Sequence, residues 1–128
     1  MRDSPLKWSD GLALAARDHC KDAGSNGLDG TIGSDMSSSF DRINRYGKAG
    51  WYRAESLTFG GPPTSKAIIE HLRTQNVQKT KKIMLNRGWQ YTGIATCEHS
   101  VHDYMTSIIY ARDFQQNYIA TETLMKLK

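Results

Sequence analysis

A stripe of small and apolar residues at helical spacing marks the first predicted element, and it comprises Leu12, Ala16, His19, Cys20 and Ala23. Residues three or four apart lie on one face of an α-helix, so the pattern predicts a helix over residues 10–23 that buries this face. Ser9 is a suitable N-cap, and Gly24 is expected to end the helix. We interpret His19 as a core histidine with satisfied hydrogen bonds, because nothing nearby indicates a catalytic pair with Cys20.

Further helical patterns follow along the chain. Gly47 is a natural residue to end the second of the predicted helices, which has Phe40, Ile43 and Tyr46 on one side. A short basic helix over residues 78–86 and a helical tail are also predicted. These later patterns begin at Ser37–Ser39, at Thr64 or Ser65, at Gln78 and at Tyr118.

Three segments are typical of β-strands. One runs from Gly50 to the turn at Gly60, and residues 89–97 and 104–114 flank a polar connection that is typical of a hairpin. Strands together with helices predict an α+β domain built from packed layers. The connection contains Glu98, His99, His102 and Asp103, whose spacing fits no zinc motif, so it is predicted to be a solvated turn.

Glu55 stands in the middle of the first strand, after Ala54 and before the apolar residues Leu57 and Phe59. An unpaired carboxylate is costly in such surroundings. Glu55 is therefore predicted either to belong to a polar site or to be an internal anchor for hydrogen bonds.

The composition is that of one globular domain. The chain has 128 residues, of which 38% are hydrophobic and 23% charged, and this length is enough for one core. A net charge of +4 suits an anionic surface but is too small to indicate nucleic acid by itself. No apolar run approaches the ~20 residues of a membrane span, and the first residues lack the apolar stretch of a signal peptide.

The two cysteines, Cys20 and Cys97, lie far apart in the sequence. Both a structural bridge and free thiols are compatible with two residues, and free buried thiols are favoured. A disulfide between them would favour an exported protein.

Several motifs, in order along the chain, resemble those of the CAP superfamily (cysteine-rich secretory proteins, antigen 5 and plant pathogenesis-related proteins), also called SCP domains. Each motif is weak alone, but their common order and spacing make the resemblance specific. The matching stretches are Pro5-Leu6-Lys7-Trp8, Leu12-Ala13 with Ala16, Gly33-Ser34-Asp35, Phe40-Asp41-Arg42-Ile43, Ala54-Glu55-Ser56-Leu57, Ile83-Met84-Leu85-Asn86, Gly93-Ile94-Ala95 and Tyr110 to Phe114.

The resemblance implies an α-β-α sandwich around an antiparallel sheet. The CAP/SCP-like domain is expected over residues 1–114, followed by a C-terminal tail over residues 115–128. The chain starts at the first motif of the family. The helix that precedes this motif in relatives is therefore expected to be lacking, or to come from a parent chain or a partner.

The resemblance also implies a candidate site. Most relatives place two His and two Glu in a central cleft, where they can hold a divalent metal such as zinc. The corresponding positions in this chain are Thr31, Glu55, Thr74 and Thr80. Neutral hydroxyls do not form a zinc site. The sequence thus predicts a degenerate cleft with no metal, no cofactor and no catalytic residue, in which Glu55 accepts hydrogen bonds or pairs with a basic residue.

Two other features could supply chemistry. His71 lies one helical turn before Thr74 and could form an acid–base dyad with Glu55, but packing in place of an aromatic residue of relatives is favoured. A basic patch is typical of a solvated helix face, and an anionic partner is the alternative. Nucleic acid is the least favoured partner, because no aromatic residues are interleaved. The patch comprises Arg73, Lys79, Lys81, Lys82 and Arg87.

These observations favour a non-catalytic CAP/SCP-like binding or structural module, with protein as its partner in a larger protein or assembly. A secreted CAP protein that binds lipid or sterol without metal is the alternative. A metal-dependent hydrolase is the least favoured function. The compartment stays open, because the family is typically secreted whereas the chain shows no signal peptide.

Overall fold

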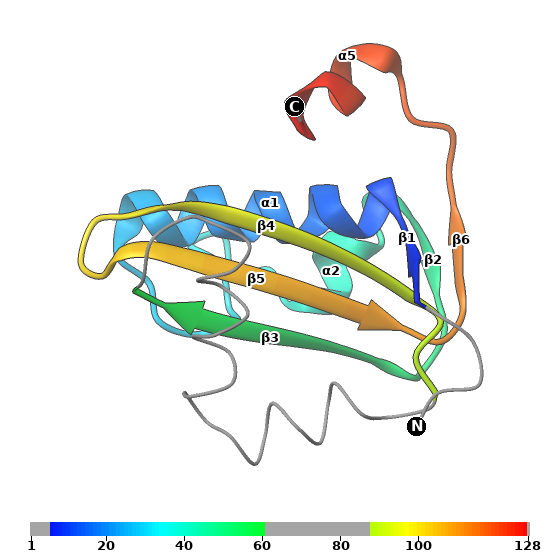
Figure 1. Ribbon diagram of the computed structural model, residues 1–128, viewed down its shortest axis with the longest axis horizontal. Helices are drawn as coiled ribbons and strands as arrows, with labels where there is room; N and C mark the ends of the chain where they lie inside the picture. Colours follow the sequence, from blue (N-terminus) through cyan, green and yellow to red (C-terminus); the bar gives the residue numbers. More distant parts are fainter. Residues whose placement is uncertain (1–5, 61–87, 128) are drawn as a thin grey trace.

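The computed structural model describes residues 6–60 and 88–127 of the chain. Figure 1 shows how the elements are arranged. In chain order these are β1 (Lys7–Trp8), α1 (Asp10–Asn26), α2 (Ser39–Ile43), β2 (Gly47–Ala49), β3 (Arg53–Phe59), β4 (Tyr91–His99), β5 (Asp103–Ala111), β6 (Phe114–Gln116), α5 (Thr121–Leu124) and the 3-10 helix η1 (Met125–Leu127).

The described strands form a main sheet in the order β1-β4-β5-β3. β4 and β5 make the predicted antiparallel hairpin, and β3 pairs antiparallel with β5. β1 pairs parallel with β4, so the sheet is mixed rather than wholly antiparallel. This difference arises because the short β1 runs alongside the start of β4 before the chain turns into α1 (Figure 1).

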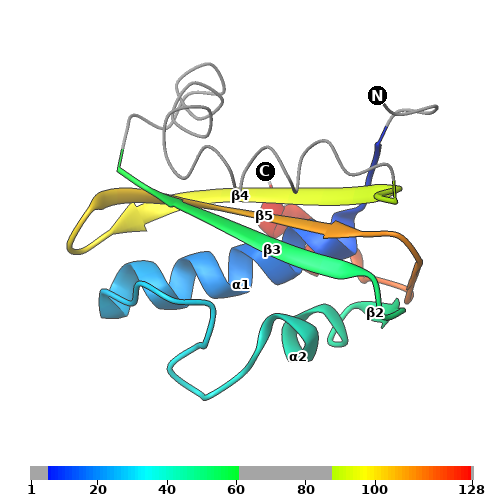
Figure 2. The same ribbon diagram turned by 90° about the horizontal axis from the view of Figure 1, so that it is seen from below.

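Helices α1 and α2 lie on the same face of the sheet (Figure 2), and the predicted α+β class is confirmed. The helices predicted after Thr64 or Ser65 and over residues 78–86 lie outside the described residues. None of the described helices is long and apolar enough to cross a membrane.

The main core lies between α1 and the sheet. Small residues on α1 allow the helix to pack closely on the strands, because an alanine side chain takes up little space between them. The cluster comprises Leu12, Ala15, Ala16, Ile43, Ile109 and Ala111, all of them fully buried.

α1 begins as predicted, with the side chain of Ser9 accepting a backbone hydrogen bond as the N-cap. It continues past Gly24 and ends at Gly27, whose φ of 66° gives a left-handed cap. The prediction that Gly24 ends the helix is therefore wrong. Gly24 instead permits close packing, since a Cβ there would lie 2.1 Å from the carbonyl oxygen of Glu98.

Gly93 allows a similar close approach between β4 and α1. A Cβ on Gly93 would lie 2.1 Å from the amide nitrogen of Ala13 and 2.4 Å from the carbonyl carbon of Leu12. These backbone atoms cannot rotate away, so Gly93→Ala is expected to lower the free energy of unfolding by about 3 kcal/mol, measured by urea denaturation. Gly30→Ala is the control, because nothing lies within 4 Å of the added Cβ. Equal losses in the two variants would contradict this account of Gly93.

The chain on either side of β3 differs from the prediction. α2 ends at Ile43, and Gly47 begins β2 instead of ending the helix. The strand predicted over residues 104–114 divides, because β5 ends at Ala111 and β6 begins at Phe114. β2 and β6 form a separate antiparallel ribbon. Strands of three residues are too short to show a periodic pattern, which is why the sequence did not indicate them.

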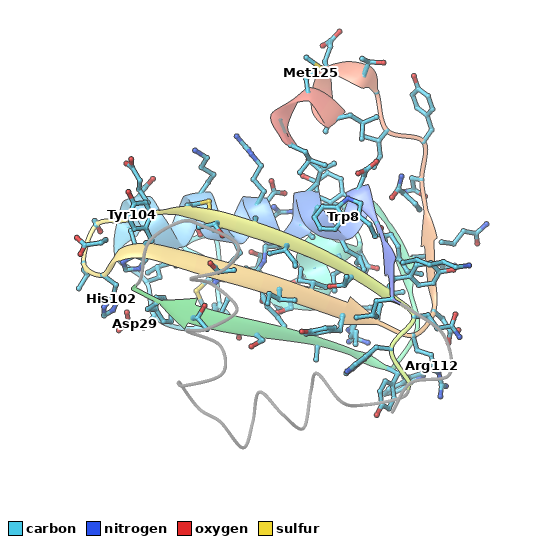
Figure 3. The ribbon with its side chains drawn as sticks, in the orientation of Figure 1. Trp8, Asp29, His102, Tyr104, Arg112 and Met125 are labelled. Atoms are coloured by element: carbon cyan, nitrogen blue, oxygen red, sulfur yellow. A yellow bond between two sulfur atoms is a disulfide. The ribbon has the colours of Figure 1, made fainter. Side chains whose placement is uncertain are left out.

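The C-terminal tail is helical over residues 121–127, a shorter range than the predicted 118–128. Leu124 and Leu127 are half-buried, and η1 lies against α1. Trp8 and Met125 mark this end of the molecule in Figure 3.

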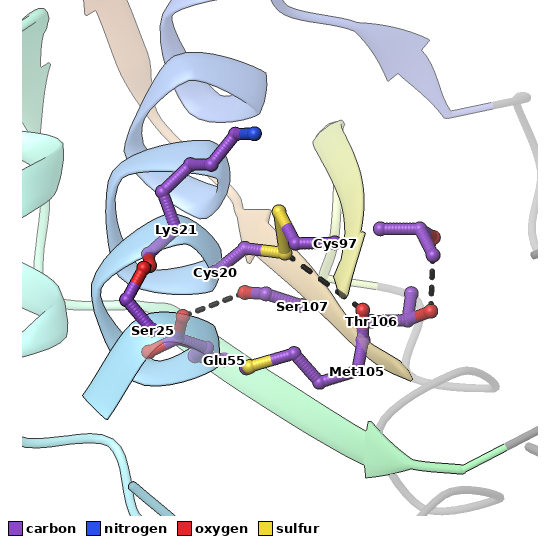
Figure 4. The surroundings of a disulfide bond; sticks show 9 residues. Cys20, Lys21, Ser25, Glu55, Cys97, Met105, Thr106 and Ser107 are labelled. Atoms are coloured by element: carbon purple, nitrogen blue, oxygen red, sulfur yellow. Dashed lines mark hydrogen bonds between the residues drawn. A yellow bond between two sulfur atoms is a disulfide. The ribbon is translucent and has the colours of Figure 1, made fainter. Parts of the chain in front are cut away.

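Cys20 and Cys97 form a disulfide that joins α1 to β4 (Figure 4). Their Cα atoms are 5.7 Å apart although the residues are separated by 77 positions in the sequence. The prediction of free thiols is therefore wrong. The physical reason is that α1 packs directly on β4, which brings the two side chains together within a buried cluster.

Candidate functional site

A cleft of about 450 Å³ lies between α2, the loop before it and the start of β3. Two of the four family positions, Thr31 and Glu55, are among its lining residues. Thr74, Thr80 and His71 lie outside the described residues, as does the basic patch of Arg73, Lys79, Lys81, Lys82 and Arg87. The cleft is lined by Thr31, Ser38, Ser39, Phe40, Ile43, Trp51, Arg53, Ala54 and Glu55.

The carboxylate of Glu55 is held by three side chains. Its Oε1 accepts hydrogen bonds from Nη2 of Arg42, at 2.9 Å, and from the hydroxyl of Ser39. Its Oε2 accepts from the hydroxyl of Ser107 at 2.7 Å, a contact drawn in Figure 4. The side chains of Arg42 and Glu55 are only 2% and 1% exposed. The prediction that Glu55 accepts hydrogen bonds or pairs with a basic residue is confirmed, and both occur.

Arg42 is held in turn by the loop before α2. Its Nη1 donates to the carbonyl oxygen of Ser37 at 2.9 Å and to the Ser37 hydroxyl at 3.1 Å. Its Nη2 also donates to the carbonyl oxygen of Thr31 at 2.6 Å, while its buried Nε has no partner in the described part of the chain. Sequence reasoning missed Arg42 as a site residue. One signal could have found it. A buried carboxylate requires a nearby positive charge, and Arg42 is a basic residue within a predicted helix.

The described residues of the cleft do not fit a divalent metal such as zinc. Zinc would need free donor atoms from several His, Cys, Asp or Glu side chains. Within residues 6–60 and 88–127, no group of three or more such residues is placed to hold a metal ion. Both oxygens of Glu55 are engaged, and a guanidinium already supplies the positive charge beside them. Thr31 contributes a backbone carbonyl to that guanidinium.

The loop that carries Thr31 is fastened to α1. Nε2 of His19 donates to the carbonyl oxygen of Gly30 at 2.7 Å, and Asp22 accepts from the amide and hydroxyl of Ser34 at 2.7 and 2.5 Å. His19 is fully buried, as predicted, but its Nδ1 has no partner among the described residues, so the expectation of a fully satisfied ring is only half met. These contacts fix the position of the Thr31 carbonyl above the buried ion pair.

Asp35 makes the stability contributed by this loop depend on pH. Hydrogen bonds from the side chain and amide of Ser37, with the charge of Arg45, lower the pKa of Asp35 to about 2. A carboxyl group with a lowered folded-state pKa stabilises the fold above its unfolded pKa of about 4, and that contribution is lost as the pH falls towards 2. The Ser37 amide shift in NMR spectra of the folded protein is expected to follow the folded-state pKa of Asp35, with a midpoint at about 2.

Asp35→Asn should abolish that titration. Asp113→Asn, in an exposed turn distant in sequence, is the control and should leave the Ser37 titration unchanged. A Ser37 shift that still titrates in Asp35→Asn would contradict the assignment.

Exposed aromatic residues form the outer rim of the cleft. Trp51 is 97% exposed and Phe40 is 37% exposed. The guanidinium of Arg53 stacks over the Phe40 ring at 3.7 Å from the ring centre and donates to the carbonyl oxygen of Gly50 at 2.9 Å. The cleft is therefore neutralised at its base, where Arg42 meets Glu55, and presents apolar surface and one cation at its mouth.

The hairpin turn is not the wholly solvated loop that was predicted. His99 is only 4% exposed, and its Nδ1 accepts from the amides of Val101 and His102 at 3.1 Å each. The other ring nitrogen therefore donates, and it contacts the carbonyl oxygen of Leu28 at 2.9 Å. His102 and Asp29 pair at 3.2 Å nearer the surface (Figure 3). These contacts fasten the turn to the end of α1, which is a structural role.

A hollow of about 750 Å³ lies beside the same turn. Glu98 and Asp103 are on its wall, with no lysine or arginine among the described lining residues, and two acidic side chains alone define no ligand. It is lined by Gly24, Ser25, Glu98, His99, Ser100, Asp103 and Tyr104.

Comparison with solved structures identifies the fold. The chain is similar to an outer surface protein from Borrelia burgdorferi, with a TM-score of 0.68 and 13% identity over 89% of this chain and 80% of that one. It is also similar to an extracellular protein containing an SCP domain from Bacillus anthracis, with a TM-score of 0.68 and 18% identity. That match covers 86% of this chain and 34% of the larger protein.

The chain therefore has a CAP/SCP-like fold, as the sequence motifs predicted. At these identities the likeness concerns the fold alone. The sequence matches no protein-family model and no curated protein.

Proposed function

We propose that the chain is a non-catalytic CAP/SCP-like module that binds a protein partner in a larger protein or assembly. The observation that carries this proposal is the engagement of Glu55 by Arg42, Ser39 and Ser107. A carboxylate with both oxygens occupied in a buried ion pair is not available to hold a metal or to move a proton. The remaining open part of the cleft offers apolar and cationic surface, which suits binding.

The disulfide supports a location outside the reducing cytosol. Disulfides persist in oxidising compartments and are rare where thiols are kept reduced. The Cys20–Cys97 bridge is buried and joins the helix layer to the sheet, as a structural bridge does. The names of the two similar structures, one an outer surface protein and one an extracellular protein, agree with this proposal.

Zinc titration of the full chain, followed by calorimetry, tests the non-catalytic assignment. We expect no stoichiometric zinc binding to the wild type, because the guanidinium of Arg42 already supplies the positive charge beside Glu55. Arg42→Ala is the informative comparison, since it frees Glu55 without adding ligands. Stoichiometric zinc in the wild type that is lost in Glu55→Gln would overturn the proposal, as would ester or peptide hydrolysis that Glu55→Gln abolishes while the fold remains intact.

Lipid or sterol binding is the second candidate, favoured by the exposed aromatic rim at Trp51 and Phe40. Mass spectrometry of organic extracts from purified protein tests it directly. A stoichiometric lipid that is retained by the wild type and lost in Trp51→Ala would support this candidate over a protein partner.

A further inference from the structure

The outer edge of β3, here called the β3 edge, borders the cleft. β3 is the last strand of the sheet, and no strand in residues 6–60 or 88–127 pairs with its outer side. In Figure 2, β3 lies in front of β5 and β4. Arg53, Ala54 and Glu55 belong both to this strand and to the lining of the cleft.

The register shows which backbone groups face outward. Tyr52 accepts from the amide of Arg112 at 3.0 Å, and Gly60 donates to the carbonyl oxygen of Tyr104 at 2.7 Å. In an antiparallel pair, residues alternate between bonding to the partner strand and pointing away from it. The even-numbered residues of β3 therefore bond to β5. Arg53, Glu55 and Leu57, which alternate with them, direct their amide and carbonyl groups to the β3 edge.

Arg53 adds a charge preference at the same place. Its guanidinium is held by the Gly50 carbonyl and the Phe40 ring, and it forms no ion pair with a carboxylate of the described residues. Trp51, next to it, is almost fully exposed. A cation beside two aromatic rings is complementary to a ligand that carries a carboxylate next to apolar groups.

We propose that the β3 edge and the adjoining cleft bind an extended, acidic segment of a partner protein as an added β-strand. The backbone of the segment pairs with the outward groups of Arg53, Glu55 and Leu57, and a carboxylate of the segment contacts Arg53. Apolar side chains of the segment cover Trp51 and Phe40. This inference rests on the proposed function and names its class of partner.

The spacing of the backbone groups favours a peptide over a lipid. Donors and acceptors repeat every second residue along the β3 edge, and an extended peptide matches this repeat through its own amides and carbonyls. A hydrocarbon chain would leave these groups without partners, which is costly if water is excluded.

Selection from a random dodecapeptide display library against the full chain tests the proposal. We expect enriched peptides to carry acidic and apolar residues and to bind in fluorescence anisotropy as synthetic peptides. Trp51→Ala should weaken their binding by about tenfold or more, as expected for an exposed aromatic anchor. Arg53→Gln should weaken it by roughly threefold to tenfold and reduce its salt dependence.

The opposite edge of the sheet supplies matched controls. Trp8 and Lys7 lie on β1, and Trp8 is 54% exposed. Trp8→Ala and Lys7→Gln should leave binding of the selected peptides unchanged. N-methylation of alternate residues in the peptide should abolish binding in one register and spare it in the other, because only one set of amides faces the β3 edge.

Each of four results would overturn the proposal: no enriched peptide, selected peptides rich in lysine, equal binding to Trp51→Ala and wild type, or equal binding of both N-methylated registers. Competition by phosphatidylserine vesicles through Trp51 and Arg53 would assign the surface to a membrane instead. These outcomes are independent of zinc binding, so they distinguish failure of this inference from failure of the non-catalytic assignment.

Discussion

Replacing Arg42 with methionine is expected to lower the free energy of unfolding by about 3–5 kcal/mol, because it leaves the buried carboxylate of Glu55 without its counter-charge. Both side chains are almost completely excluded from solvent. The loss also releases the Thr31 and Ser37 carbonyl oxygens from the guanidinium. Urea denaturation followed by circular dichroism would measure the change.

Arg45→Met is the matched control. Arg45 pairs with Asp18 and Asp35 at 3.0 Å each, but its side chain is 40% exposed. Exposed ion pairs contribute about 0–1 kcal/mol, so this variant should be much less affected. The double variant Arg42→Met with Glu55→Gln should recover part of the loss, because no unpaired charge remains. If Arg42→Met and Arg45→Met lose equal stability, the central role given to the buried pair is wrong.

Removing the disulfide is expected to lower the free energy of unfolding by about 4.5 kcal/mol on the chain-entropy model of cross-linking. The bridge closes a loop between residues separated by 77 positions, and opening it enlarges the unfolded ensemble. The double variant Cys20→Ala with Cys97→Ala should therefore unfold at a much lower urea concentration than the oxidised wild type.

The wild type under reducing conditions provides a second measurement with all side chains retained. Its urea midpoint should fall by a similar amount when dithiothreitol is present. A midpoint that is the same with and without reductant, in protein whose thiols are shown to be free, would contradict a stabilising role for the bridge.

The sequence predicted those features that leave a local pattern. The stripe from Leu12 to Ala23 indicated α1, and Ser9 indicated its start. The hairpin was indicated by two long strand-like segments on either side of the polar residues 98–103. The motifs also indicated the fold, although each motif was short.

Features that depend on distant residues could not be predicted in the same way. The pairing of β2 with β6 and the parallel contact of β1 with β4 join segments far apart in the chain. The disulfide required knowledge that α1 lies on β4. The predicted end of α1 was wrong because glycine is common at helix ends. Gly24 is instead required for close packing against the Glu98 carbonyl.

The candidate site was likewise predictable only in its local part. The need of Glu55 for partners followed from its surroundings in the strand, and hydrogen bonds or a basic partner were predicted. Their identities were not, because Ser39, Arg42 and Ser107 come from two elements on either side of β3 in the sequence. Only the packing of α2 and β5 against β3 brings them to one carboxylate.

The order of strands in the sheet has a consequence for biosynthesis. The partners of α1 are β4 and β5, which the ribosome delivers last among the long elements. Until residue 111 has emerged, the sheet that covers the apolar face of α1 is incomplete. Cys20 has no disulfide partner until Cys97 has emerged. The nascent chain is thus expected to remain unfolded through most of its synthesis, because the long-range contacts of α1 can form only near the end.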